Sequence, residues 1–135
     1  MSNKVNLIAK QTSLRDSVAF QGRTPCGDFS INHPGNGCIK MKWYIVLYAN
    51  TVKNEPTTYL LNRSQMFPLE YPGKKGTWKI ISGKDGRIIY ELTPDKETIP
   101  TYLLKLDEGV LIFIDANGNL LVGDHDFSYI LNRSF

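Results

Sequence analysis

The stretch that most constrains the fold is Ile39 to Leu47, where apolar and mainly polar positions alternate along the chain. The odd-numbered positions hold Ile, Met, Trp, Ile and Leu, whereas the even-numbered ones begin with Lys40 and Lys42. Successive side chains of a β-strand point to opposite faces, so a period of two places all the odd-numbered side chains on one side. The pattern predicts a strand with one buried face.

Further short strands are predicted at regular spacing, each bounded by turn residues. They cover Val18–Thr24, Thr57–Arg63, Thr77–Ile81, Arg87–Leu92, Thr101–Leu106, Val110–Ile114, Leu120–Val122 and Phe127–Arg133, with a short or edge strand at Met66–Tyr71. Asn117-Gly118 is the strongest two-residue hairpin signal of the chain. Gly22 is predicted to form a bulge in the first strand.

The order of these strands predicts an all-β fold, an up-and-down antiparallel barrel of about eight strands. Sequential hairpins favour this topology, and closure removes the exposed edges that an open sheet would present. A two-sheet β-sandwich is the alternative. We expect one barrel domain over residues 18–135, preceded by residues 1–17 as a tail or a short capping segment.

The composition is that of an ordinary globular domain, with 135 residues, 41% of them apolar and 21% charged. The net charge of +3 comes from thinly spread basic residues, so we expect no nucleic-acid partner. No apolar run approaches the ~20 residues of a membrane helix, and the first residues lack the apolar core of a signal peptide. We therefore expect a monomer without a transmembrane segment, and no signal peptide within the chain.

Catalytic motifs are missing from the sequence. There is no Gly-x-Ser-x-Gly, and Gly73–Thr77 and Ser82–Gly86 lack the spacing of a phosphate-binding loop. Acidic residues such as Asp95, Asp107 and Asp115 lie in or beside turns, where acids are common for structural reasons. We expect that the protein is not an enzyme.

The segment Pro25 to Cys38 contains both cysteines and one of the two histidines. Cys26, His33 and Cys38 have the spacing Cys-x6-His-x4-Cys, and thiolate and imidazole are the ligands that copper(I) and zinc prefer. A structural zinc site needs a fourth ligand. A Cys26–Cys38 disulfide is the simpler hypothesis, since closing a loop of this length would stabilise the fold by about 3 kcal/mol. Two unpaired thiols, or a copper or zinc site that includes His33, are the alternatives.

The order of features resembles the N-terminal domain of the NlpE-type lipoproteins, a family linked to copper resistance and envelope stress. In that family a strand ends in Gly-x-x-Pro-Cys, and a turn-rich loop, a long strand and a Gly-x-Trp strand follow. The counterparts here are Phe20–Cys26, Ile39–Tyr48 and Gly76-Thr77-Trp78. Leu103–Gly109 and Phe113–Asn119 match the later segments, so that the resemblance spans most of residues 18–133.

This resemblance implies a small, lipocalin-like bacterial barrel of the cell envelope or periplasm. Family members are usually exported and often lipid-anchored. The family has Cys-x-x-Cys directly after the proline, whereas this chain has Phe29 at the second position and its next cysteine only at Cys38. Only Cys26 matches directly, so the family's two-cysteine site does not transfer as it stands, and the chain resembles a divergent branch.

Two functions follow as expectations. The first is a non-enzymatic, NlpE-like envelope protein that acts in metal handling or stress sensing with an envelope protein partner. The second is a lipocalin-like binder of a small apolar ligand in the barrel interior. Candidate ligand-binding residues for the second function are Trp43, Trp78, Tyr90 and Phe113, although packing of the core is the simpler explanation for them.

Overall fold

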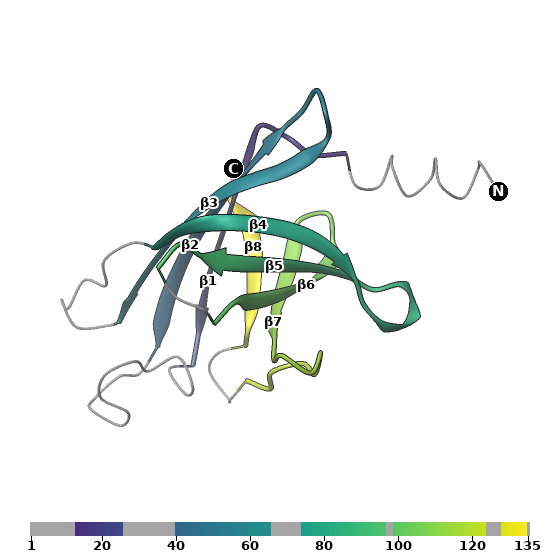
Figure 1. Cartoon of the computed structure of the whole chain (residues 1–135). Coiled ribbons are helices and arrows are strands. Elements are labelled where there is room, and N and C mark those ends of the chain that lie inside the picture. The colour runs from purple at the N-terminus through teal and green to yellow at the C-terminus, as the bar shows by residue number, and fades with distance from the viewer. Residues whose placement is uncertain (1–12, 26–39, 66–73, 97–98, 124–127, 135) are drawn as a thin grey trace.

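The computed structural model describes residues 13–25, 40–65, 74–96, 99–123 and 128–134. They form a closed antiparallel barrel in which each strand pairs with the next and the last pairs with the first (Figure 1). The strands are β1 (Ser17–Thr24), β2 (Met41–Asn50), β3 (Glu55–Gln65), β4 (Lys74–Ser82), β5 (Ile88–Pro94), β6 (Thr101–Asp107), β7 (Val110–Ile114) and β8 (Ile130–Ser134). The predicted up-and-down eight-stranded barrel is confirmed, and the sandwich alternative is wrong.

The alternation in β2 is the burial pattern of the folded strand. Met41, Trp43, Ile45 and Leu47 are buried inside the barrel, whereas Tyr44 and its even-numbered neighbours face outward. Neighbouring strands keep this parity through their register, because Ile45 lies opposite Phe20 of β1 on one side and Leu61 of β3 on the other. The period of two therefore fixes which side chains fill the interior.

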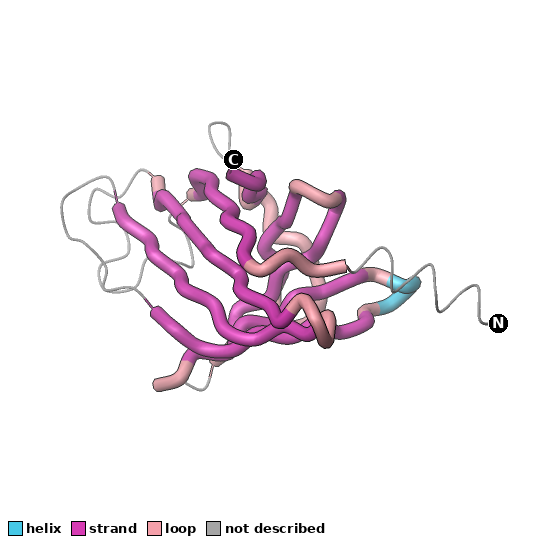
Figure 2. Tube along the Cα trace, turned by 90° about the horizontal axis from the view of Figure 1, so that it is seen from above, coloured by secondary structure: helices cyan, strands magenta, loops and turns pink. Residues whose placement is uncertain are grey.

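Three tight connections join the strands at one end of the barrel. They lie between β2 and β3, between β4 and β5, and between β6 and β7, and the second contains the short helix η2 (Lys84–Gly86). Figure 2 shows the strands curving round one central space, with η2 at the tip of the long β4–β5 hairpin. Among the described residues, no helix is long and apolar enough to cross a membrane.

The predicted bulge at Gly22 is wrong, because the pairing of β1 with β2 runs without a shift from Ser17 to Thr24. Gly22 serves a close approach of backbones. A Cβ atom there would lie 2.6 Å from the carbonyl oxygen of Ile130 and 2.9 Å from a methyl carbon of Leu131. Glycine is what lets β8 lie against β1 at this point.

The Asn117-Gly118 turn follows β7, although its geometry differs from a two-residue hairpin. Positive φ occurs at Gly118 and not at Asn117, and the amide of Gly118 donates to the carbonyl oxygen of Asp115 at 3.0 Å. The return from this turn pairs with β7 only through a bridge of Ile114 with Leu120. The predicted Leu120–Val122 strand is therefore a single bridge, and the predicted Met66–Tyr71 strand lies outside the described residues.

Strands β5, β6 and β7 each have neighbouring residues that are buried on both faces of the barrel wall. Consecutive residues are buried in each strand, as in Ile89 with Tyr90 and in Leu103 with Leu104. All of Leu111 to Ile114 is buried in β7. This continuous apolar run is typical of a strand covered on both sides, and it explains why β7 shows no alternation in the sequence.

Candidate functional site

The barrel has two unlike ends. The turn end carries the three tight connections and the start of β1. The opposite end, which we call the loop end, carries the end of β1 and the starts of β2, β4 and β6. Each end contains one pair of tilted aromatic rings from the set predicted to bind a ligand. The two pairs differ in what surrounds them.

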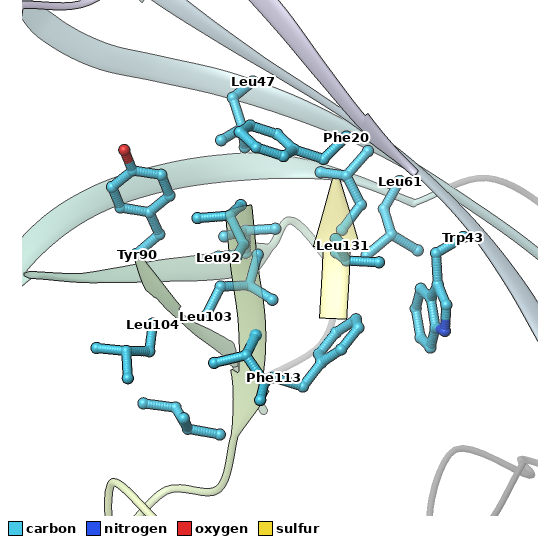
Figure 3. Packing of buried hydrophobic residues seen from close by; sticks show 14 of the residues in the cluster. Phe20, Trp43, Leu47, Leu61, Tyr90, Leu92, Leu103, Leu104, Phe113 and Leu131 are labelled. Carbon is cyan, nitrogen blue, oxygen red and sulfur yellow. The ribbon is translucent and has the colours of Figure 1, made fainter. Parts of the chain in front are cut away.

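At the loop end, Trp43 packs against Phe113 with ring centroids 4.8 Å apart and an angle of 49° between the planes. The indole Nε1 of Trp43 donates a hydrogen bond of 2.9 Å to the hydroxyl oxygen of Thr24, whose side chain is completely buried. This bond satisfies the polar group of a buried tryptophan. Figure 3 shows both rings among the leucines of the interior.

At the turn end, Trp78 packs against Tyr90 with ring centroids 5.0 Å apart and an angle of 59°. The indole nitrogen of Trp78 donates to the carbonyl oxygen of Tyr48 at 2.8 Å. In Figure 3 the hydroxyl of Tyr90 points away from Leu92 and Leu103. Trp78 and Tyr90 therefore lie beside polar groups at the turn end, and their surroundings differ from those of Trp43 and Phe113.

A cavity of about 50 Å³ opens at the turn end, and we call it the mouth pocket. Its apolar walls come from Leu14, Val18, Phe20, Leu47 and Trp78. Its polar lining comes from Ser13, Arg15, Tyr90, Lys105, Glu108 and Arg133. A volume of this size holds about three or four water molecules or one small chemical group. It is far below the ~300 Å³ at which pockets for drug-sized ligands begin.

The charged lining comes from four parts of the chain: the segment before β1 with Arg15, strand β6, the β6–β7 turn and strand β8. Lys105 follows Leu103 on the inward face of β6, and its ammonium lies 3.1 Å from a carboxylate oxygen of Glu108 in the β6–β7 turn. The Lys105 side chain is only 12% exposed, whereas that of Glu108 is 69% exposed. Arg133 lies opposite Phe20 in the pairing of β8 with β1, and its amide donates to the carbonyl oxygen of Gly109 at 2.8 Å.

The Tyr90 hydroxyl is held in its neutral form. Burial and, as the smaller cause, the nearby negative charge of Glu108 raise the pKa of Tyr90 to about 12. Both effects disfavour the phenolate, the first by removing water and the second by repulsion. Tyr90 is therefore a hydrogen-bond donor at every pH at which the protein would ordinarily work.

The segment before β1 closes one side of the mouth pocket. The amide of Leu14 donates to the side-chain oxygen of Asn54 at 2.8 Å, and the carbonyl oxygen of Asp16 accepts from the amide of Ala49 at 3.1 Å. These two bonds fix residues 13–16 against the β2–β3 turn. They place Leu14 and Arg15 at the rim of the pocket.

The predicted metal or disulfide residues Cys26, His33 and Cys38 lie outside the described residues. The described part of the chain contains no group of three or more metal-ligating side chains. Strand β1 ends at Thr24, two positions before Cys26 in the sequence. The hypotheses of a disulfide, of free thiols and of a copper or zinc site therefore stay predictions.

The charged groups of the mouth pocket were missed by the sequence analysis, although a signal for two of them was present. Lys105 has the same parity as Leu103, and Arg133 has the same parity as Leu131, so both basic residues occupy inward positions of their strands. A charged residue at an inward position is a marker of a polar site. Arg15 and Glu108 lie in connections, where parity gives no such information.

No protein-family model, curated protein or solved structure matches this chain. The resemblance to the NlpE-type lipoproteins therefore has no family match to support it, and the structure shows only the eight-stranded antiparallel barrel that it implies.

Proposed function

We propose that the protein is a non-enzymatic binding protein that takes the end of a small ligand into the mouth pocket. The observation that carries this proposal is the contrast within the barrel. Trp43 and Phe113 belong to the buried apolar cluster and lack a place in the lining of the cavity at the turn end, which Tyr90 and Lys105 line among the described residues. A pocket with apolar walls and a few convergent polar groups is the usual form of a ligand site.

The fold limits how a ligand can bind. A cavity of about 50 Å³ cannot enclose a whole lipocalin-type ligand, so the bulk of the molecule would lie outside the barrel end. Affinity would then come from a buried head group and from contact of the remainder with the rim near Leu14. This differs from the prediction that the whole of a small apolar ligand binds in the barrel interior.

Tryptophan fluorescence provides the test, because Trp78 lines the mouth pocket and Trp43 does not. In a Trp43→Phe variant, Trp78 is the remaining tryptophan. Small neutral, cationic and anionic compounds would be screened for saturable changes in its emission. The matched Trp78→Phe variant retains Trp43 and should show little change. If no compound saturates the Trp43→Phe signal, or if both variants respond equally, the proposal fails.

The second candidate is the NlpE-like envelope role, with Cys26 in metal handling or stress sensing and an envelope protein as partner. The small closed barrel supports it, and so does the end of β1 at Thr24, two positions before Cys26. The reduced protein would be titrated with copper(I) and with zinc beside a Cys26→Ser variant. Equal binding by the two proteins, or binding by neither, would exclude the metal role.

A further inference from the structure

We propose that the mouth pocket recognises a carboxylate head group, with Lys105, Arg133 and the Tyr90 hydroxyl as its donors. This inference rests on the proposed function and names the chemical class of its ligand. Short aliphatic or aromatic monocarboxylates are the molecules that fit. The charge balance, the Lys105–Glu108 pair, the neutral tyrosine and the size of the cavity support it separately.

The charge balance of the pocket favours an anion. Among the described residues, its lining carries three basic side chains, from Arg15, Lys105 and Arg133, and one carboxylate, from Glu108. The Nε atom of Arg133 is buried, and so is most of the Lys105 side chain. Positive charges in such surroundings are screened less by salt than those on an open surface. A ligand with one negative charge lowers this excess.

Within the protein itself, a carboxylate already contacts Lys105 in the way proposed for the ligand. Glu108 places a carboxylate oxygen 3.1 Å from the ammonium of Lys105 at the edge of the pocket. Because the Glu108 side chain is 69% exposed and lies in a turn, water can replace Lys105 as its partner at little cost. The buried Lys105 has no comparable access to water. A ligand carboxylate could therefore take the place of Glu108.

The third donor distinguishes the proposed site from a simple pair of charges. Tyr90 lines the mouth pocket with its hydroxyl pointing away from Leu92 and Leu103, and this hydroxyl remains protonated because its pKa is about 12. A neutral hydroxyl donates one hydrogen bond to a carboxylate oxygen. Beside this polar group, Phe20 and Leu47 provide an apolar wall that suits the first methylene groups of a ligand chain.

The size of the cavity selects the head group. About 50 Å³ accommodates a carboxylate and little more, so the ligand chain must leave through the rim. An inorganic phosphate would bring a second negative charge near Glu108 and would leave the apolar wall uncovered. The pocket therefore suits a carboxylate that carries an apolar chain better than a free inorganic anion.

Sodium hexanoate titrated into the full chain tests this inference, with binding followed by amide chemical shifts and by calorimetry. Hexanol, hexylammonium and inorganic phosphate serve as comparison probes. We expect saturable binding of hexanoate, with shifts centred on Lys105 and Arg133, and no saturation by the other three probes. Loss of a hydrogen bond to a charged group in the Lys105→Met variant should weaken hexanoate binding by about tenfold or more.

The decisive variant is Glu108→Gln, which changes an exposed side chain and should leave folding intact. Removing the competing carboxylate should strengthen hexanoate binding by about threefold to tenfold, in keeping with charge–charge effects at half-exposed sites. The matched control is Glu91→Gln, which breaks the Lys79–Glu91 ion pair of 3.2 Å on the outer wall of the barrel. It should leave hexanoate affinity unchanged.

The outcomes separate the two proposals. Hexanol that binds as tightly as hexanoate, or a Glu108→Gln variant with unchanged or weaker hexanoate binding, overturns the carboxylate inference and leaves ligand binding at the mouth intact. Tight binding of phosphate overturns it in the same way. If none of the four probes binds, and the wider fluorescence screen is also negative, both proposals fall.

Discussion

The two ends of the barrel contain the same structural unit, a tilted pair of aromatic rings, in two different settings. At the loop end, Trp43 and Phe113 are closed off by the hydrogen bond of Trp43 with Thr24. At the turn end, Trp78 and Tyr90 form the floor of a cavity whose rim carries Lys105 and other charged groups. The same aromatic unit therefore lies among buried side chains at one end of the barrel and beside a cavity with charged groups at the other.

The largest expected loss of stability comes from a change in the Trp43–Phe113 pair at the loop end. Phe113→Ala should destabilise the protein by about 3–5 kcal/mol, because it leaves a cavity in a core with no solvent access. Urea denaturation measures this loss. The control is Tyr44→Ala on the outer face of β2, which should cost about 1 kcal/mol or less. Similar losses for the two variants would mean that the loop end is not tightly packed.

At the turn end, Tyr90 of the Trp78–Tyr90 pair should make the stability of the protein depend on alkaline pH. The pKa of Tyr90 is raised from 10.0 to about 12, so the unfolded chain loses this proton before the folded protein does. The stability that the protonated Tyr90 contributes to the folded protein is fully present below pH 10. It is lost as the pH rises toward 12, and the free energy of unfolding falls by about 2–3 kcal/mol in total. Denaturation midpoints across this interval would measure it. A Tyr90→Phe variant should lack this component, and an identical loss in both proteins would contradict the assignment.

The Thr24–Trp43 hydrogen bond should contribute a smaller amount. Thr24→Val keeps the shape of the side chain and removes the acceptor of the buried indole N–H, at a cost of about 1–3 kcal/mol. Thr77→Val, on the exposed face of β4, is the matched control and should change stability by about 0.5 kcal/mol or less. Were the two variants equally stable, the loop end would not depend on this bond.

The smallest effect belongs to the Asn117-Gly118 turn, which follows β7 at the loop end. Hydrogen bonds from the backbone of Asn119 and Asn117 to the Asp115 carboxylate lower its pKa. A lowered pKa gives a contribution that is present above the ordinary value and is lost as the pH falls through the folded value. Carboxyl carbon NMR should show Asp115 titrating below its usual range. Titration at or above that range would show that the turn does not hold the carboxylate.

The alternation of residue types made the fold predictable, because apolar residues in β2 occupy every second position and are the ones buried in the structure. Sequential hairpins then left the barrel and the sandwich as the choices, and the pairing of β8 with β1 decides between them. β7 was predicted from its apolar composition alone, since both of its faces are buried. The Gly22 bulge was predicted wrongly because a strand glycine marks either a bulge or a close approach of backbones, and only the neighbouring strand shows which.

The candidate site was less predictable for a topological reason. Lys105, Glu108 and Arg133 come from β6, the turn after it and β8. Their spacing in the sequence therefore does not predict that they line one pocket. Inward parity singles out the two basic residues once the strands are known. The cavity itself depends on how the segment around Leu14 lies against the β2–β3 turn, through long-range bonds that no sequence motif encodes.

The pairing of β8 with β1 has a consequence for the order of folding. Every other neighbouring pair of strands is consecutive in sequence, whereas this seam joins Ala19 to Ser134 and Gln21 to Asn132. Contacts between distant parts of a chain carry the greatest loop-closure entropy, so they form late. The hairpins can assemble as a growing ribbon from β1 onward, and the ring closes only when β8 arrives. Because Arg133 belongs to β8, the mouth pocket is complete only when β8 has paired with β1 and the barrel is closed.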